Sequence, residues 1–331
     1  MFKRLLILTL LTALLLGLVP ALAASPVEDL TMLAQYFPFD APAYAALNTG
    51  DETITELDNL LAAVLAKVPA SIPLPEGLSL RAALDTIAHD ADTADFETGI
   101  RSWLGDYAAV GVTMKDDPTT AASEGTLLAA QITDRAAAVA FWRAILDRGG
   151  SPTYAVEEGD AFTMLAIQSD PPIEGGLLFT DEVMLLGVEN LRALLLTRDA
   201  KLAQNDTFQQ TLALLPAELY GGLVYLNLPV LADESADSRM AAEVLGPQAL
   251  GFALLDERSL VLDVASKLGD TSALADQGFT LPVLAPVNPA FAANLPADAS
   301  LVAHASNLRG FYDAFIEFDR FQVSQWTDGS K

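Results

Sequence analysis

The densest group of acidic residues in the chain follows one of its two histidines. Asp90, Asp92 and Asp95 lie within six residues of His89. Carboxylate oxygens are the ligands that Ca²⁺ prefers, so these three aspartates form a candidate calcium site. Their spacing departs from an EF-hand loop, because Ala94 stands at the third ligand position and Asp95 at the glycine position. The alternative, which the spacing favours, is a solvated loop between two helices.

Paired carboxylates are a second feature that could do chemistry, because two of them can cleave a glycosidic bond. Such groups occur at three predicted hairpin turns, namely Glu157/Glu158/Asp160, Asp181/Glu182 and Asp256/Glu257. Turns favour acidic residues for conformational reasons, and 44 acids make chance pairs common. The sequence therefore assigns no catalytic residue to these turns.

Nucleophile and cofactor motifs are missing from the sequence. There is no G-x-S-x-G, S-x-x-K, H-E-x-x-H, Walker A or G-x-G-x-x-G pattern, and neither His89 nor His304 lies beside a signature serine. The absence of cysteine excludes disulfides, thiolate metal sites and a thiol nucleophile. We expect no cofactor and a noncatalytic protein. An envelope hydrolase with carboxylate chemistry and a carrier of an apolar ligand remain the alternatives.

The charge balance excludes two classes of partner. The 331 residues include 18 basic and 44 acidic side chains, which gives a net charge of -26. Nucleic-acid binding and docking on anionic lipid both depend on clustered Lys and Arg. We therefore expect the partner to be an unidentified protein or another envelope component.

The first 23 residues have the pattern of a secretory signal peptide. Lys3 and Arg4 precede an apolar run over residues 5–19, and an A-x-A cleavage pattern, Ala21-Leu22-Ala23, follows Pro20. The apolar run is shorter than the roughly 20 residues of a comfortable membrane span. We therefore expect export with cleavage near Ala23, to the periplasm or the exterior. An uncleaved segment, which would anchor the protein on the outer side of the membrane, is the alternative.

Beyond this segment, helical and strand periodicities alternate in blocks. They predict an α+β fold with antiparallel sheets in two lobes and helices packed mainly on one face. The expected helices are 54–68, 80–89, 96–104, 134–148, 190–197 and 235–245, with a further helix that Asp206 caps. The expected strands are 107–114, 126–132, 153–156, 161–167, 176–180, 183–187, 221–228, 250–255 and 260–265.

The same periodicities suggest a domain division. Residues 24–270 form the α+β body, with possible sub-lobes 24–150 and 151–270. Four prolines and weak periodicity mark 271–298 as a linker. Residues 299–331 resemble the start of a second, truncated unit.

One pattern recurs three times in the sequence. Residues 37–48, 215–228 and 295–308 each contain an apolar residue and a proline, an acid two residues later, an apolar run and then an asparagine. The pattern predicts strands at 44–48, 223–228 and 301–305, each followed by a helix or helical turn. The alternative is that this pattern merely suits the passage from a helix to a strand.

Aromatic residues are concentrated in the first of these segments and near the C-terminus. Tyr36, Phe37, Phe39 and Tyr44 belong to the first group, and Phe311, Phe315 and Phe318 share one helical face in the second. Such groups could line a groove for an apolar ligand or pack in a core, and the sequence favours the core.

Several short motifs carry a resemblance to a known family. They are the signal segment, the segment around Pro38 and Tyr44, Trp103-Leu104-Gly105-Asp106 before a strand, the helix from Asp134, and Asn205-Asp-Thr-Phe208 leading to Tyr225-Leu-Asn-Leu228. Over residues 30–270 the chain resembles the bacterial exported proteins of domain-of-unknown-function family 3352. The resemblance implies an exported or membrane-tethered α+β protein without established catalytic residues.

Overall fold

The computed structural model describes most of the chain before residue 270. The described residues are 25–65, 79–115, 123–149, 153–168, 175–188, 190–196, 200–216, 219–232, 236–256, 259–267 and 269. The chain divides into two compact units, Met1–Ala232 with Gly246–Lys267, and Asp233–Leu245 with Leu268–Lys331. The expected signal peptide 1–23, linker 271–298 and C-terminal unit 299–331 lie outside the described residues.

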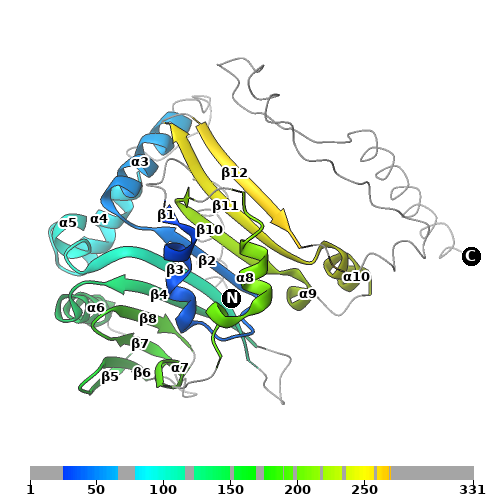
Figure 1. The fold of residues 1–331 in the computed structure, drawn as a ribbon. Coiled ribbons are helices and arrows are strands. Elements are labelled where there is room, and N and C mark those ends of the chain that lie inside the picture. Colours follow the sequence, from blue (N-terminus) through cyan, green and yellow to red (C-terminus); the bar gives the residue numbers. More distant parts are fainter. Residues whose placement is uncertain are drawn as a thin grey trace, which may run out of the picture. The chain divides into compact units, whose positions relative to one another are not determined.

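Ten strands of the first unit form one antiparallel sheet, so the fold is α+β. Their order across the sheet is β12-β11-β10-β2-β3-β4-β8-β7-β6-β5 (Figure 1). The strands are β2 (Ala43–Asn48), β3 (Leu104–Lys115), β4 (Ser123–Ile132), β5 (Thr153–Glu158), β6 (Thr163–Gln168), β7 (Gly176–Phe179), β8 (Val183–Gly187), β10 (Gly222–Asn227), β11 (Pro247–Asp256) and β12 (Ser259–Ser266). A separate pair joins β1 (Ser25–Pro26) to β9 (Leu219–Tyr220).

This single sheet contains strands from both of the possible sub-lobes. Strands from residues 24–150 lie in the middle, and strands from residues 151–270 flank them on both sides. Residues 24–150 and 151–270 therefore share one sheet. The sequence could not indicate this, because strand pairing between distant segments is a tertiary choice that local periodicity does not encode.

The sheet has a core on each face, because successive residues of a strand point to opposite sides. On β4, Leu127 and Ala129 face one core, whereas Ala130 and Ile132 face the other. We call the first the tyrosine core, since it contains Tyr44, Tyr220 and Tyr225, and the second the tryptophan core, since it contains Trp103 and the partly buried Trp142.

Helices cover both of these cores. The tyrosine core takes residues from α2 (Val27–Thr31), η1 (Met32–Tyr36), α7 (Leu191–Leu196), η2 (Leu202–Gln204) and α8 (Asp206–Leu212). The tryptophan core takes residues from α3 (Asp51–Leu65), α4 (Leu80–Asp90), α5 (Phe96–Gly99) and α6 (Arg135–Gly149). An apolar stripe shows that a helix docks, but not on which side of the sheet.

Two of the three recurring segments form neighbouring strands in the interior of the sheet. β2 and β10 pair antiparallel, with Ala45 opposite Val224. The Asn48 N–H donates to the Gly221 carbonyl at 2.9 Å, and the Asn227 N–H donates to the Pro42 carbonyl at 2.7 Å. These equivalent bonds place a local two-fold axis between the strands, which relates β2-β3-β4 to β10-β11-β12.

The strand predictions at 44–48 and 223–228 are thereby confirmed, including the helices that follow. β2 leads to α3, and β10 leads to α9 (Leu228–Leu231). The third expected strand, 301–305, lies outside the described residues. In the second unit the described part comprises α10 (Ala236–Leu245) and Gly269, whose N–H donates to the Val244 carbonyl at 3.1 Å.

The cap of α8 differs by one residue from the expectation. Asn205 is the N-cap, and its side-chain oxygen accepts from the Phe208 N–H at 3.1 Å, whereas Asp206 is the first helical residue. Asn and Asp are both good caps, so the sequence alone could not separate them.

Candidate functional site

Two of the three candidate calcium ligands lie beside an arginine. The Arg148 guanidinium, from α6, lies 3.4 Å from an Asp92 carboxylate oxygen and 4.0 Å from one of Asp90. The same guanidinium donates to the main-chain carbonyl of His89. A positive charge from the protein itself therefore neutralises part of this acidic loop.

The third candidate, Asp95, caps a helix. Its side chain accepts from the Thr98 N–H at 2.9 Å and from the Thr98 hydroxyl at 2.8 Å at the start of α5. These hydrogen bonds hold the pKa of the Asp95 carboxyl below its usual value. In the described part of the chain, His, Asp and Glu side chains nowhere gather in threes as metal ligands. The calcium site stays a prediction.

Other aspartates also bind backbone N–H groups at helix starts. Asp58 accepts from Leu80, Asp85 from Phe96 at 2.8 Å, and Asp134 from Ala137 at 2.9 Å. Each bond satisfies one of the donors that an α-helix leaves unpaired in its first turn. These carboxylates are thus committed to local structure.

The hairpin acids contact side chains on neighbouring elements. Glu157 pairs with Arg192, and Glu158 accepts from the Thr163 hydroxyl at 3.3 Å. Asp181 lies 3.3 Å from the Arg135 Nε. The structure thus gives Glu157, Glu158 and Asp181 individual partners. Glu257 and the side chain of Asp256 lie outside the described part of the chain.

Arg101 is a charged residue that sequence reasoning missed. Its Nε lies 3.2 Å from Asp51, its Nη2 donates to Asp106 at 3.0 Å, and its Nη1 donates to the Thr49 carbonyl at 2.9 Å. The side chain is only 18% exposed. Arg101 thus joins the loop after β2 to the start of β3. Its signal in the sequence is weak, since it is a single basic residue among scattered acids.

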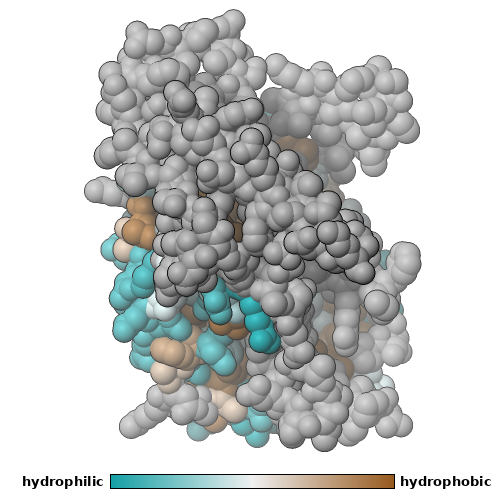
Figure 2. Space-filling view, turned by 90° about the vertical axis from the view of Figure 1, so that its right-hand side faces the viewer, coloured by the Kyte–Doolittle hydropathy of each residue, from teal (hydrophilic) through white to brown (hydrophobic). Residues whose placement is uncertain are grey.

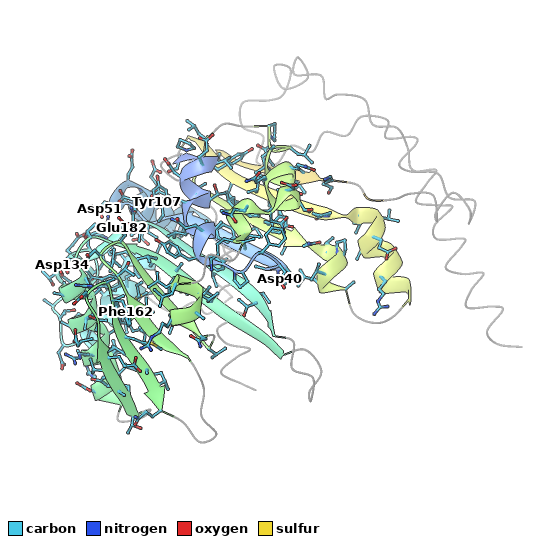
Figure 3. The ribbon with its side chains drawn as sticks, turned by 60° about the horizontal axis from the view of Figure 1, so that its bottom comes forward. Asp40, Asp51, Tyr107, Asp134, Phe162 and Glu182 are labelled. Carbon is cyan, nitrogen blue, oxygen red and sulfur yellow. The ribbon has the colours of Figure 1, made fainter. Side chains whose placement is uncertain are left out.

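The polar residues around Arg101 lie toward one end of the strands. Asp51 and Tyr107 are found there together with Asp134 and Glu182, whereas Asp40 lies toward the opposite end (Figure 3). The connections explain this arrangement, because β2 ends where β3 begins, and β4 ends where β8 begins. Acids and arginines from three strand connections, β2–β3, β4–β5 and β7–β8, therefore lie at this end of the strands.

A polar cluster around Ser25 is the second feature that the sequence did not predict. The Ser25 hydroxyl is buried, accepts from the Asn48 side chain at 2.8 Å and lies 3.3 Å from the Tyr107 hydroxyl, which also approaches Asp29 at 3.3 Å. Burial raises the pKa of Tyr107. An amide and a neutral phenol do not activate a serine as a nucleophile, so the cluster anchors β1 to the sheet.

Among the described residues, one carboxyl group has a raised pKa. Burial, and secondarily the neighbouring charge of Glu52, raises the pKa of Glu56 on α3. Residues four apart on a helix face the same side, so Glu52 and Glu56 lie together. A raised pKa beside a second carboxylate is what the hydrolase alternative requires, although repulsion within any acidic helix produces it too.

The aromatic residues near Tyr44 pack in the tyrosine core. Phe37 and Tyr44 are buried and meet edge to face at 5.1 Å between ring centroids, and Phe208 lies 5.6 Å from Tyr44 and 5.0 Å from Tyr225. Phe39, at 43% exposure, is the exception. This packing favours the core interpretation over a ligand groove. The residues from Phe311 onward lie outside the described part.

The described surface mixes polar and apolar residues. Figure 2 shows hydrophilic and hydrophobic residues interspersed where the described residues reach that side. Among the helices that the structure describes, none has the length and apolar character needed to cross a membrane.

Comparison with known proteins identifies one family. The family model described as "Protein of unknown function (DUF3352)" matches residues 5–328, which is nearly the whole chain. No curated protein and no solved structure matches the chain.

Proposed function

We propose that this chain, which belongs to the DUF3352 family of proteins of unknown function, is a noncatalytic binding or structural protein of the bacterial cell envelope. One observation carries the proposal. Asp58, Asp85, Asp95 and Asp134 each accept a hydrogen bond from a backbone N–H at a helix start. Carboxylates held in this way fix the starts of helices, which is a structural role.

Export supports the envelope location. The charged start, the apolar run and the A-x-A pattern that ends at Ala23 have the order that signal peptidase recognises. Ser25 follows directly and is held by Asn48 and the β1–β9 pair, so a mature chain beginning near Ala24 keeps these bonds. Net negative charge favours solubility outside the membrane and repels nucleic acid.

Export is tested with the full precursor expressed in a bacterium. We expect intact mass measurement on the envelope fraction to find a chain that begins within a residue or two of Ala24. A chain that retains Met1 and sediments with membranes would replace the signal peptide with a signal anchor.

The noncatalytic character is tested by screening the mature chain against glycosidase, esterase, phosphatase and peptidase substrates. We expect no turnover above a buffer blank. Glu56→Gln is the critical variant, because Glu56 combines a raised pKa with a neighbouring carboxylate, and Glu97→Gln is the matched control on a surface ion pair. Turnover that Glu56→Gln abolishes and Glu97→Gln retains would establish the hydrolase alternative.

A further inference from the structure

The two edges of the ten-stranded sheet differ in chemistry. β5, at one edge, ends in Glu157 and Glu158, both exposed and charged. β12, at the other edge, exposes Leu262 at 52% and Val264 at 58%. Charged residues are the usual protection of an edge strand against pairing with another chain. β5 has this protection, and the exposed face of β12 lacks it.

The local two-fold axis shows what β12 corresponds to. Ala43, Val112 and Thr126 form a row of opposed residues across β2, β3 and β4, and Gly222, Phe252 and Leu262 form the equivalent row across β10, β11 and β12. β12 is therefore the counterpart of β4.

β4 is an interior strand, whereas β12 is an edge strand among the described residues. Leu128 of β4 lies opposite Leu186 of β8, and Val264 is the counterpart of Leu128. β12 thus has the apolar residues of an interior strand. On the side where β4 pairs with the apolar strand β8, β12 has no partner strand among the described residues. Its one acid in this region, Asp263, accepts from the Tyr220 hydroxyl at 2.7 Å, which draws the carboxylate toward the tyrosine core.

We propose that β12 pairs with β12 of a second copy of this chain, forming a two-fold symmetric dimer with one continuous sheet. A second copy offers two edges, and the charged β5 edge is the poorer partner for an apolar strand in a protein of net charge -26. Pairing of β12 with itself is antiparallel and closes after two copies. It repeats the two-fold pairing that β2 and β10 make within the chain.

The register of this pairing follows from charge. Opposed side chains of an antiparallel pair point to the same face of the sheet. The two-fold axis of the dimer must therefore lie where one residue of β12 is opposite its own copy, and not midway between two residues. An axis through Asp263 would set two carboxylates opposite each other, which is unfavourable. An axis through Leu262 keeps the same overlap and sets Leu262 opposite Leu262 of the second copy, with Asp263 opposite the position of Val261.

Single cysteines test this register, because the chain has no cysteine of its own. Opposed residues of an antiparallel pair have Cα atoms about 4.5–5.5 Å apart, which a disulfide spans. Leu262→Cys should therefore form a covalent dimer under mild oxidation. Val264→Cys is the matched control, since the two copies of residue 264 lie four positions apart along the strands, roughly 14 Å, and should stay monomeric on a denaturing gel.

Sedimentation of the mature wild-type chain provides the second measurement. We expect a dimer whose dissociation constant rises at least about tenfold in Leu262→Lys, because a lysine at an edge opposes strand pairing. Leu196→Lys, at a 63% exposed position on α7, should leave the constant unchanged. A wild-type monomer at about 100 µM, or equal cross-linking of the two cysteine variants, would overturn the proposal. Either result would do so also if another segment of the chain or a different partner pairs with β12.

Discussion

Tyr44 of β2 is buried in the tyrosine core, and its hydroxyl donates a 2.8 Å hydrogen bond to the main-chain carbonyl of Leu30 in α2. This bond joins the first helix to the centre of the sheet. Tyr44→Phe removes one oxygen atom and keeps the ring, so the edge-to-face contacts with Phe37 and Phe208 are retained. The variant therefore measures the hydrogen bond with little change in packing.

The expected loss follows from burial. A typical intramolecular hydrogen bond stabilises a protein by about 1 kcal/mol, and a buried acceptor deprived of its donor costs about 1–3 kcal/mol. We expect Tyr44→Phe to lower the free energy of unfolding by about 1–2 kcal/mol. Tyr107→Phe is the control, because its hydroxyl contacts Ser25 and Asp29 at a longer distance of 3.3 Å and is less buried than that of Tyr44. That variant should change the free energy by less than about 0.5 kcal/mol.

Urea unfolding, followed by tryptophan fluorescence, compares the two variants at equal protein concentration. With a slope near 2–3 kcal/mol per molar urea, Tyr44→Phe should move the midpoint down by roughly 0.5 M. Equal midpoints for Tyr44→Phe and wild type, or a larger loss in Tyr107→Phe, would refute the assignment of the Tyr44 bond as a link between α2 and the sheet.

Three further changes test other parts of the fold. Burial raises the pKa of Tyr225 to about 12, above its ordinary 10.0. The contribution of this phenol to stability is therefore complete below pH 10 and is lost as the pH rises through 12. In urea titrations, Tyr225→Phe should make the free energy of unfolding fall less steeply over that pH range. Asn205→Ala should cost about 1 kcal/mol in thermal unfolding and Asp206→Ala less than half as much, and the reverse order would contradict the assigned cap. Gly251→Ala places a Cβ 2.3 Å from a ring carbon of Tyr220, so calorimetry should show a loss of about 1–3 kcal/mol, and an unchanged melting temperature would contradict this close approach.

Much of the local structure could be predicted from the periodicity of apolar residues and from the turn residues between elements. The helix expected at 134–148 is α6, and the hairpins expected around residues 157–160 and 181–182 are β5–β6 and β7–β8. These elements have strong apolar periods and turn residues at their ends, which act over a few residues only. Boundaries were less well predicted, as Asn205 shows, because neighbouring residues of similar capping ability compete for one position.

The candidate sites were less predictable than the elements. Asp90, Asp92 and Asp95 are adjacent in sequence, yet Arg148 reaches the first two from a helix more than fifty residues away, and Asp95 caps its own helix. Arg101 also draws its partners from separate loops. An ion pair depends on the positions of both partners, and these positions are set by the packing of the helices on the sheet.

The sequence by itself determined the α+β class, the family, the order of helices and strands, and the recurrence of the segments that become β2 and β10. Only the tertiary structure decided that these two strands pair in the interior of one sheet, that helices cover both of its faces, and that among the described residues β12 lies at an edge although it is the counterpart of the interior strand β4. The physical reason is range: backbone preference and apolar periodicity act between near neighbours, whereas strand partners and buried faces are chosen by contacts between segments far apart in the chain.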